Sequence, residues 1–121
     1  MQGQRIVLGV SGGISAYKTP ALVRQLVAAG MEVIPVMTKS AHQFVTSTVL
    51  TSLSGNRVRD DLWDLDAERS MGHIELARWA DTLLIAPATA NLLARLANGL
   101  GDDLLTTLYL ATTAPTIVAP A

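Results

Sequence analysis

The sequence predicts a three-layer α/β domain in which helices cover both faces of a parallel sheet. Short apolar runs rich in β-branched residues recur along the chain without polar–apolar alternation, as is typical of strands buried on both faces. Helix-like segments separate these runs, so consecutive strands are expected to be joined by right-handed helical crossovers. A length of 121 residues suits one small domain.

Four segments are predicted as strands. The first runs from Arg5 to Val10, and the second from Glu32 to Met37. Within the second, Pro35 favours a position near a sheet edge or a strand end, because proline cannot donate to a ladder. The third and fourth strands are expected over residues 82–86 and 116–119.

The first predicted helix covers Tyr17 to Ala29 and ends at Gly30, which stands at the C-cap position. Thr19 and Pro20 suit an N-cap and first helical position, but a helix that begins near Gly13 fits equally well, and both starts remain open. One apolar stripe on this helix consists of Leu22, Val23, Leu26 and Val27.

Three further helices are predicted over 74–80, 90–98 and 102–111. Asp102 and Asp103 suit the start of the last, because carboxylates complement the positive end of the helix dipole. The acidic stretch 60–68 reads as a solvated connection. Elsewhere, His42 is expected on a helix face, and the expected core residues are Phe44, Trp79 and Leu83.

Composition excludes several classes of function. No apolar run approaches the roughly 18 residues needed to cross a bilayer, and the first residues lack the pattern of a signal peptide. A net charge of −1 argues against a nucleic-acid partner, and the absence of cysteine excludes disulfides and thiolate metal sites. We expect a soluble, cytoplasmic domain with neither a membrane nor a nucleic-acid partner.

Four loops are candidates for ligand binding because they follow the carboxyl ends of predicted strands: 11–15, 38–41, 87–91 and whatever follows Ala121. Three of these loops contain candidate residues. In Ser11-Gly12-Gly13, the glycines allow backbone N–H groups to approach an anion at a helix start, or they simply meet the dihedral needs of a tight turn. Thr38-Lys39-Ser40 offers two hydroxyls and an ammonium, or a helix N-cap. Thr89-Ala90-Asn91 permits a flat ring to lie against backbone, or Thr89 caps a helix.

His73 follows a glycine at a predicted helix start, where a histidine either serves chemistry or faces solvent. His73 and Glu75 are two residues apart rather than four, so they do not lie on one helix face as a metal-binding pair would. No third ligand is evident, and no metal site is predicted.

Four segments together resemble the phosphopantothenoylcysteine decarboxylases, which are homo-oligomeric flavin-containing cysteine decarboxylases. Gly9 to Lys18 resembles the opening of these proteins, and Met71 to Asp81 resembles their active-site histidine segment. Residues 86–91 and 98–105 resemble their flavin loop and the stretch after it. The resemblance is collinear from about residue 5 to residue 121.

The resemblance implies a flavodoxin-like fold that binds FMN at a subunit interface in a trimer-based homo-oligomer. The implied reaction is decarboxylation of 4′-phospho-N-pantothenoylcysteine to 4′-phosphopantetheine in coenzyme A biosynthesis. His73 corresponds by position to the catalytic histidine. The implied FMN-binding residues are Ser11, Gly12, Gly13, Thr38, Lys39, Ser40, Thr89, Ala90, Asn91, Leu92 and Ala121.

Family members continue past the segment that matches Ala121, into a Met-Asn substrate motif and a flap with a catalytic cysteine. Bacterial members add a CTP-dependent ligase domain. We therefore expect residues 1–121 to be an FMN-binding decarboxylase domain truncated at its C-terminal end, and inactive as this fragment alone.

Three alternatives compete with this interpretation. Another flavin-dependent cysteine decarboxylase or a flavin prenyltransferase would share the fold, although prenyltransferases do not use the histidine pattern around His73. A non-catalytic FMN-binding or regulatory module would share the loops. A dinucleotide-binding dehydrogenase is disfavoured, because GxGxxG is absent and no acidic residue ends the second strand.

Overall fold

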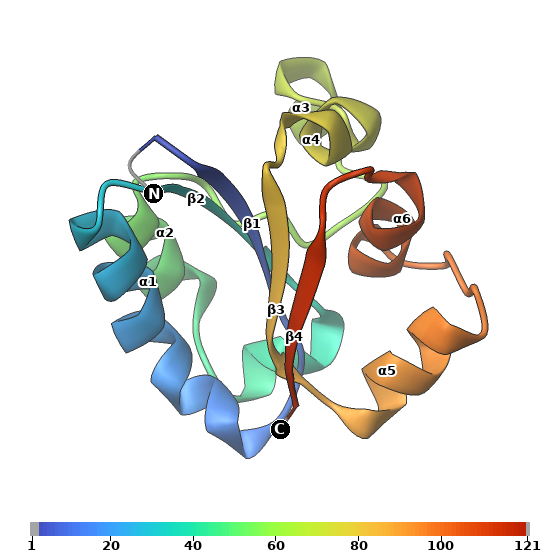
Figure 1. Ribbon diagram of the computed structural model, residues 1–121, viewed down its shortest axis with the longest axis horizontal. Coiled ribbons are helices and arrows are strands. Elements are labelled where there is room, and N and C mark those ends of the chain that lie inside the picture. Colours follow the sequence, from blue (N-terminus) through green and yellow to red (C-terminus); the bar gives the residue numbers. More distant parts are fainter. Residues whose placement is uncertain (1–2, 121) are drawn as a thin grey trace.

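The computed structural model describes residues 3–120 as a parallel sheet with helices on both faces (Figure 1). The strands are β1 (Arg5–Val10), β2 (Glu32–Met37), β3 (Thr82–Ala88) and β4 (Thr116–Pro120). Their order in the sheet is β2-β1-β3-β4. The chain moves from β1 to β2 on one side and then crosses to β3 on the other, so a topological switch point lies between β1 and β3.

β2 is an edge strand, in agreement with the prediction from Pro35. A short segment around Arg59 covers this edge. Its backbone N–H donates to the carbonyl of Pro35 at 2.9 Å, and its carbonyl accepts from the N–H of Met37 at 2.9 Å. Pro35 has no N–H to donate, but its polar backbone groups point to the Arg59 side of β2. β1 pairs with the opposite side, so the sheet loses no hydrogen bond between β1 and β2.

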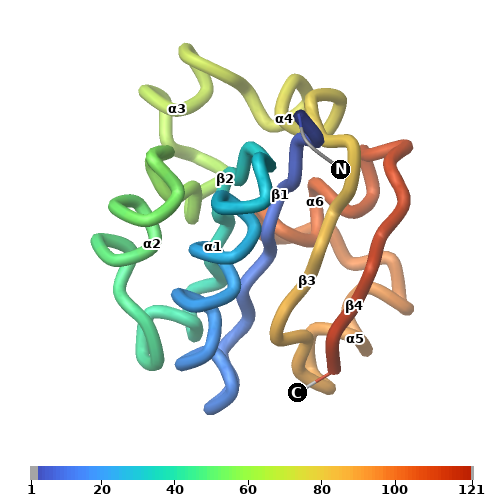
Figure 2. The backbone as a smooth tube through the Cα atoms, turned by 60° about the vertical axis from the view of Figure 1, so that its left-hand side comes forward, coloured from blue at the N-terminus to red at the C-terminus, as the bar shows by residue number. Residues whose placement is uncertain are grey.

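Two helices cover one face of the sheet, and Figure 2 shows them side by side. They are α1 (Thr19–Ala28) and α2 (Ser47–Ser54), and short 3₁₀ turns precede them at Ile14–Lys18 and Lys39–Gln43. Alternate residues of β1 pack into this layer. Its buried core includes Ile6, Leu8, Val10, Val23, Val33, Met37 and Leu50.

The other face carries α4 (His73–Trp79), α5 (Ala90–Ala97) and α6 (Leu104–Ala111). Its core includes Val7, Val36, Leu76, Leu83, Ile85, Leu92, Leu105 and Leu108. Gly9 lies on this face, where an added Cβ would come within 2.7 Å of a methyl carbon of Leu105. Glycine at that position thus permits α6 to approach the sheet closely.

The predicted strands are confirmed, and the described structure extends the third to Ala88 and the fourth to Pro120. The helix expected over 17–29 divides into a 3₁₀ turn and α1, so the chain is helical from Ile14, and Pro20 lies in the first turn of α1. Gly30 follows this helix with φ of 87°, a conformation that glycine adopts without strain.

Two helices in the structure were not predicted from the sequence. The stretch 60–68 is not only a connection, because α3 (Leu65–Ser70) begins in it. Asp64 caps that helix, and its carboxylate accepts from the backbone N–H of Asp66 at 3.1 Å and of Ala67 at 3.2 Å. No helix was predicted at 47–54, where α2 lies.

The prediction of three core residues was correct only in part. Phe44 is not a core residue, since it is 43% exposed while the neighbouring Val45 takes the buried position. Trp79 is partly buried against the core, and Leu83 is fully buried as predicted. Within residues 3–120, no helix is long and apolar enough to span a membrane.

Candidate functional site

Three loops that follow β1, β2 and β3 meet in one polar hollow at the carboxyl end of the sheet, next to the switch point. Its volume is about 280 Å³. Its lining residues are Ser11, Gly12, Thr38, Ser40, Thr89, Asn91, Leu92, Arg95 and Asp103. The fold thus brings together the three loops that the sequence singled out, as the strand-end rule for open α/β sheets requires.

Ser11 ties the first loop to the third. Its Oγ donates to the carbonyl of Pro87 at 2.5 Å and accepts from the backbone N–H of Thr89 at 3.0 Å. Ser11 is 2% exposed, and its own N–H also reaches the Pro87 carbonyl at 3.3 Å. The peptide bond before Pro87 is cis. Ser11 therefore fixes the spacing of two loops at the hollow.

Gly12 lets the first loop approach the second. An added Cβ would lie 2.3 Å from Oγ of Ser40 and 2.7 Å from its backbone carbonyl carbon. No side chain fits at those distances, so the residue is glycine for close approach as well as for backbone access to a ligand. Gly13 does not line the hollow; it precedes the 3₁₀ turn, and its N–H donates to the carbonyl of Ser11 at 3.1 Å.

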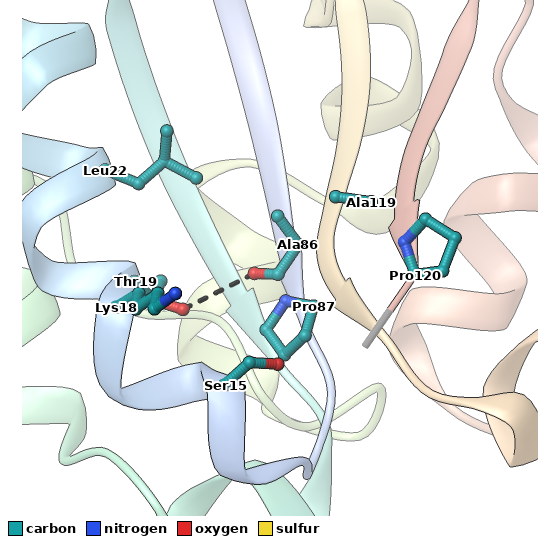
Figure 3. Close-up of a pocket in the computed structure, with 8 residues that line it drawn as sticks. All are labelled: Ser15, Lys18, Thr19, Leu22, Ala86, Pro87, Ala119 and Pro120. Carbon is teal, nitrogen blue, oxygen red and sulfur yellow. Dashed lines mark hydrogen bonds between the residues drawn. The ribbon is translucent and has the colours of Figure 1, made fainter.

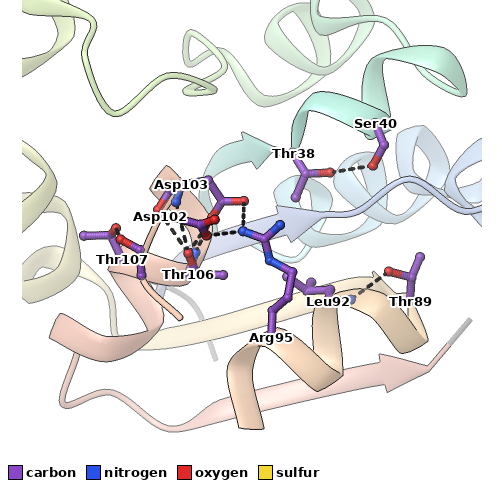
Figure 4. Close-up of polar contacts among 10 residues, drawn as sticks. Thr38, Ser40, Thr89, Leu92, Arg95, Asp102, Asp103, Thr106 and Thr107 are labelled. Carbon is purple, nitrogen blue, oxygen red and sulfur yellow. Dashed lines mark hydrogen bonds and ion pairs between the residues drawn. The ribbon is translucent and has the colours of Figure 1, made fainter. Parts of the chain in front are cut away.

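The second loop presents two hydroxyls to the hollow. Thr38 and Ser40 lie with their side-chain oxygens 3.4 Å apart, and the Thr38 side chain does not cap the following 3₁₀ turn (Figure 4). In this pair one hydroxyl donates to the other, so one hydroxyl keeps its hydrogen free for an acceptor such as a phosphate oxygen. Lys39 is exposed and does not line the hollow.

The third loop combines a cap with a free amide. Thr89 caps α5 by accepting from the backbone N–H of Leu92 at 3.2 Å, as predicted. Asn91 is exposed and lines the hollow, where its side chain makes no hydrogen bond to another described residue. Ala90 does not line the hollow. Ala121, the last predicted binding residue, lies outside the described residues.

Sequence reasoning did not place Arg95 or Asp103 at the hollow, although it correctly placed Asp103 at a helix start. Arg95 pairs with the carboxylates of Asp102 and Asp103, the latter at 3.5 Å, across the hollow (Figure 4). Asp103 also caps α6, where it accepts from the N–H of Thr106 at 2.8 Å. Arg95 stands four residues after Asn91 on one helix, a spacing that puts both on one face, and this signal was available in the sequence.

His73 lies in a second, separate hollow. That hollow has a volume of about 390 Å³ and a mainly apolar lining of Leu62, Trp63, Leu65, Glu68 and His73. Nδ1 of His73 is 2.7 Å from Oε1 of Glu68. The hydrogen bond from His73 holds the pKa of the Glu68 carboxyl below its usual range, so this carboxyl is ionised at neutral pH.

A third hollow of about 260 Å³ adjoins Pro87, between residues of α1, β3 and β4 (Figure 3). The Thr19 hydroxyl donates to the Ala86 carbonyl at 3.4 Å beside it, and Oγ of Ser15 has no hydrogen-bond partner among residues 3–120. The lining is otherwise mainly apolar, from Leu22, Ala86, Pro87, Ala119 and Pro120. Among residues 3–120 there is no group of three or more acidic or histidine side chains placed to hold a metal ion.

The polar hollow has the donors that a flavin nucleotide needs. It offers the hydroxyls of Thr38 and Ser40, the unpartnered amide of Asn91, and a glycine whose missing side chain opens the backbone. Nε of Arg95 is buried without a hydrogen-bond partner among the described residues. These groups fit a phosphate and a polyol chain.

Comparison with known proteins identifies the family of the chain. The family model described as Flavoprotein matches residues 1–121. The chain is 57% identical, over its full length, to the coenzyme A biosynthesis bifunctional protein CoaBC of Vibrio vulnificus (strain YJ016), of which it spans 30%. It therefore covers about a third of the length of such curated relatives.

Solved structures share the fold. The FMN-dependent cysteine decarboxylase TvaF from thioviridamide biosynthesis superposes with a TM-score of 0.88 at 31% identity, over 98% of this chain and 74% of that one. A PPC decarboxylase mutant complexed with pantothenoylaminoethenethiol gives 0.77 at 36% identity, over 98% and 66%. The fold is flavodoxin-like, and the chain belongs to the Flavoprotein family.

Proposed function

We propose that this chain is the FMN-binding part of a cytoplasmic phosphopantothenoylcysteine decarboxylase, which converts 4′-phospho-N-pantothenoylcysteine to 4′-phosphopantetheine in coenzyme A biosynthesis. The convergence of three loops in one polar hollow at the switch point carries the proposal. The similarity to a bifunctional coenzyme A biosynthesis protein supports this pathway and a linked CTP-dependent ligase domain.

Within the proposal, the polar hollow holds FMN. Thr38 and Ser40 donate to its phosphate or ribityl oxygens, and Asn91 hydrogen-bonds the ring system. Gly12 lets the backbone of the first loop approach the cofactor, and Ser11 keeps that loop in place. We add Arg95, whose guanidinium reaches the same hollow while two carboxylates hold it.

Bound FMN supplies a reversible two-electron oxidation of the substrate thiol, which provides the electron sink that loss of carbon dioxide needs. The protein positions the substrate and the cofactor relative to each other. His73 is proposed to bind the substrate carboxylate or to accept a proton through its ring, and the apolar side chains of Leu62 and Trp63 line the hollow beside it.

His73 and the polar hollow do not meet within one copy of the chain. α4 lies near the end of the sheet where β3 begins, and α5 starts at the other end (Figure 1). β3 has seven residues, so the two ends are roughly 20 Å apart. We propose that a second copy completes the site, in a trimer-based homo-oligomer with FMN between subunits.

Substitution of His73 tests the proposed function in the complete, FMN-loaded protein. His73→Asn is expected to abolish formation of 4′-phosphopantetheine, measured by mass spectrometry, and to leave the flavin spectrum unchanged. His42→Asn is the matched control, because His42 pairs with Asp60 outside both hollows and its loss should leave turnover intact. Normal turnover in His73→Asn, or a colourless wild-type protein that takes up no added FMN, would refute the proposal.

A further inference from the structure

We infer that Glu68 is a positioning residue for His73: it holds the proton on Nδ1, so that Nε2 is the nitrogen turned toward the substrate. The inference rests on the proposed catalytic role of His73. It assigns to α3 the function of orienting the ring of His73.

One carboxylate oxygen fixes both the backbone and the ring of His73. Oε1 of Glu68 accepts from the backbone N–H of His73 at 3.2 Å and lies 2.7 Å from Nδ1. An ionised carboxylate only accepts hydrogen bonds, so the hydrogen between them belongs to Nδ1. A neutral imidazole carries one N–H, and Nε2 is therefore an acceptor. Nε2 makes no hydrogen bond to another described residue, and so remains available.

Gly72 makes this contact possible. An added Cβ at Gly72 would lie 2.8 Å from Oε2 of Glu68, so a side chain there would displace the carboxylate. The turn between α3 and α4 is itself anchored, since the buried Arg59 donates through Nη1 to the carbonyl of Met71 at 2.7 Å. Glu68 and His73 are thus held at a fixed separation by the backbone between them.

The apolar surroundings strengthen the hydrogen bond between His73 and Glu68. The side chains of His73 and Glu68 are 32% and 30% exposed, and the apolar hollow beside them lowers the local polarity. The hydrogen bond from His73 keeps the pKa of Glu68 below its usual range, so the carboxylate is ionised throughout the range in which histidines titrate. A neighbouring carboxylate that orients a histidine also stabilises the charge that develops when that histidine takes up a proton.

Two variants of the complete, FMN-loaded protein test the inference. Glu68→Ala removes the acceptor, and Gly72→Ala displaces the carboxylate while retaining its charge. Both should lower kcat by about 100-fold, the cost of a small misplacement of a reacting group, with KM and bound flavin unchanged. Glu68→Gln retains an accepting oxygen and should fall between them and the wild type. Asp66→Asn, an exposed carboxylate on the same helix, is the matched control and should keep full turnover.

The ring tautomer provides a readout independent of activity. We expect ¹⁵N chemical shifts of the His73 ring, assigned by their absence in His73→Asn, to show Nδ1 protonated in the wild type. Glu68→Ala and Gly72→Ala should populate both tautomers. Wild-type shifts or full turnover in these two variants would overturn the positioning role, as would an equal loss in Asp66→Asn. Should His73→Asn itself retain turnover, the proposed function fails while the tautomer shift still reports on Glu68.

Discussion

At the scale of single residues, the hydroxyl of Ser11 shows how a predicted binding residue also serves the fold. Its Oγ joins the carbonyl of Pro87 to the N–H of Thr89, and both partners lie in the loop that also forms the hollow. Because Ser11 is buried, removal of the hydroxyl leaves the N–H of Thr89 without a replacement from water, and leaves the carbonyl of Pro87 with only the 3.3 Å bond from the Ser11 N–H. Ser11, which the sequence alone suggests as a ligand contact, thus also joins two loops through hydrogen bonds.

Ser11→Ala should therefore lower the free energy of unfolding by about 1–3 kcal/mol, the cost of leaving buried partners unsatisfied. Urea denaturation of the complete protein, followed by circular dichroism, measures the change. Ser52→Ala on α2 is the control, because Ser52 is exposed and its loss should stay within about 0.5 kcal/mol. Equal stability of Ser11→Ala and the wild type would contradict the role of Ser11 in joining the two loops.

The Glu68 carboxyl predicts a pH dependence of stability. Its pKa is lowered in the folded state by the hydrogen bond from His73, relative to a reference value of 4.5. A carboxyl with a depressed pKa stabilises the fold above its unfolded pKa, and this contribution is lost as pH falls through the folded pKa. Glu68→Gln should therefore be less stable than the wild type at pH 6, with the difference vanishing well below pH 4.5 in thermal melts. Asp66→Asn should show no such convergence.

At the scale of elements, the strands were predictable and some helices were not. Continuous apolar runs mark strands buried on both faces, and this pattern located β1 to β4 within two residues. α2 was missed because serine and threonine interrupt its apolar stripe, although Thr46 and Gly55 mark its two ends. α3 was missed because its acidic residues read as solvated, although Asp64 is its N-cap.

The composition of the hollow was predictable only in part, for a physical reason. Loop residues follow strand ends, so the strand pattern alone places Ser11, Thr38 and Thr89 at one edge. The i, i+4 spacing of Asn91 and Arg95 indicates a shared helix face, but no local spacing shows the contact between Arg95 and Asp103, the N-cap of the next helix. The outward direction of Lys39 likewise depends on the 3₁₀ turn that it begins.

The second loop should contribute to cofactor affinity through its hydroxyls. Thr38→Val and Ser40→Ala are each expected to weaken FMN binding about ten-fold or more, because a hydrogen bond to a charged phosphate contributes roughly 1.5–3 kcal/mol. Quenching of flavin fluorescence during titration of the apo form of the complete protein measures the affinity. Ser52→Ala, a serine on α2 away from the hollow, should bind as the wild type does. Unchanged affinity in both loop variants would remove the hollow as the phosphate site.

At the scale of the whole molecule, the two halves of the proposed site occupy different parts of one chain. The polar hollow lies at the carboxyl end of the sheet, and the hollow of His73 lies beside α3 and α4. Large apolar side chains stand exposed around the latter: Trp63 is 80% exposed, Leu65 is 71% exposed and Ile74 is 45% exposed. Contiguous exposed apolar groups of this size are typical of a surface that another chain covers.

Trp63→Glu should therefore weaken assembly without unfolding the domain, since this side chain has few contacts within its own chain to lose. A buried carboxylate without a partner opposes association, whereas the same group on a free surface is well solvated. Sedimentation velocity of the complete protein should show smaller species at micromolar concentration, with an unchanged circular dichroism spectrum and decreased turnover. Val27→Glu on α1, on the other face of the sheet, is the control and should keep the wild-type size. Wild-type size and turnover in Trp63→Glu would mean that a second copy does not cover this surface, and that His73 meets its substrate by another route.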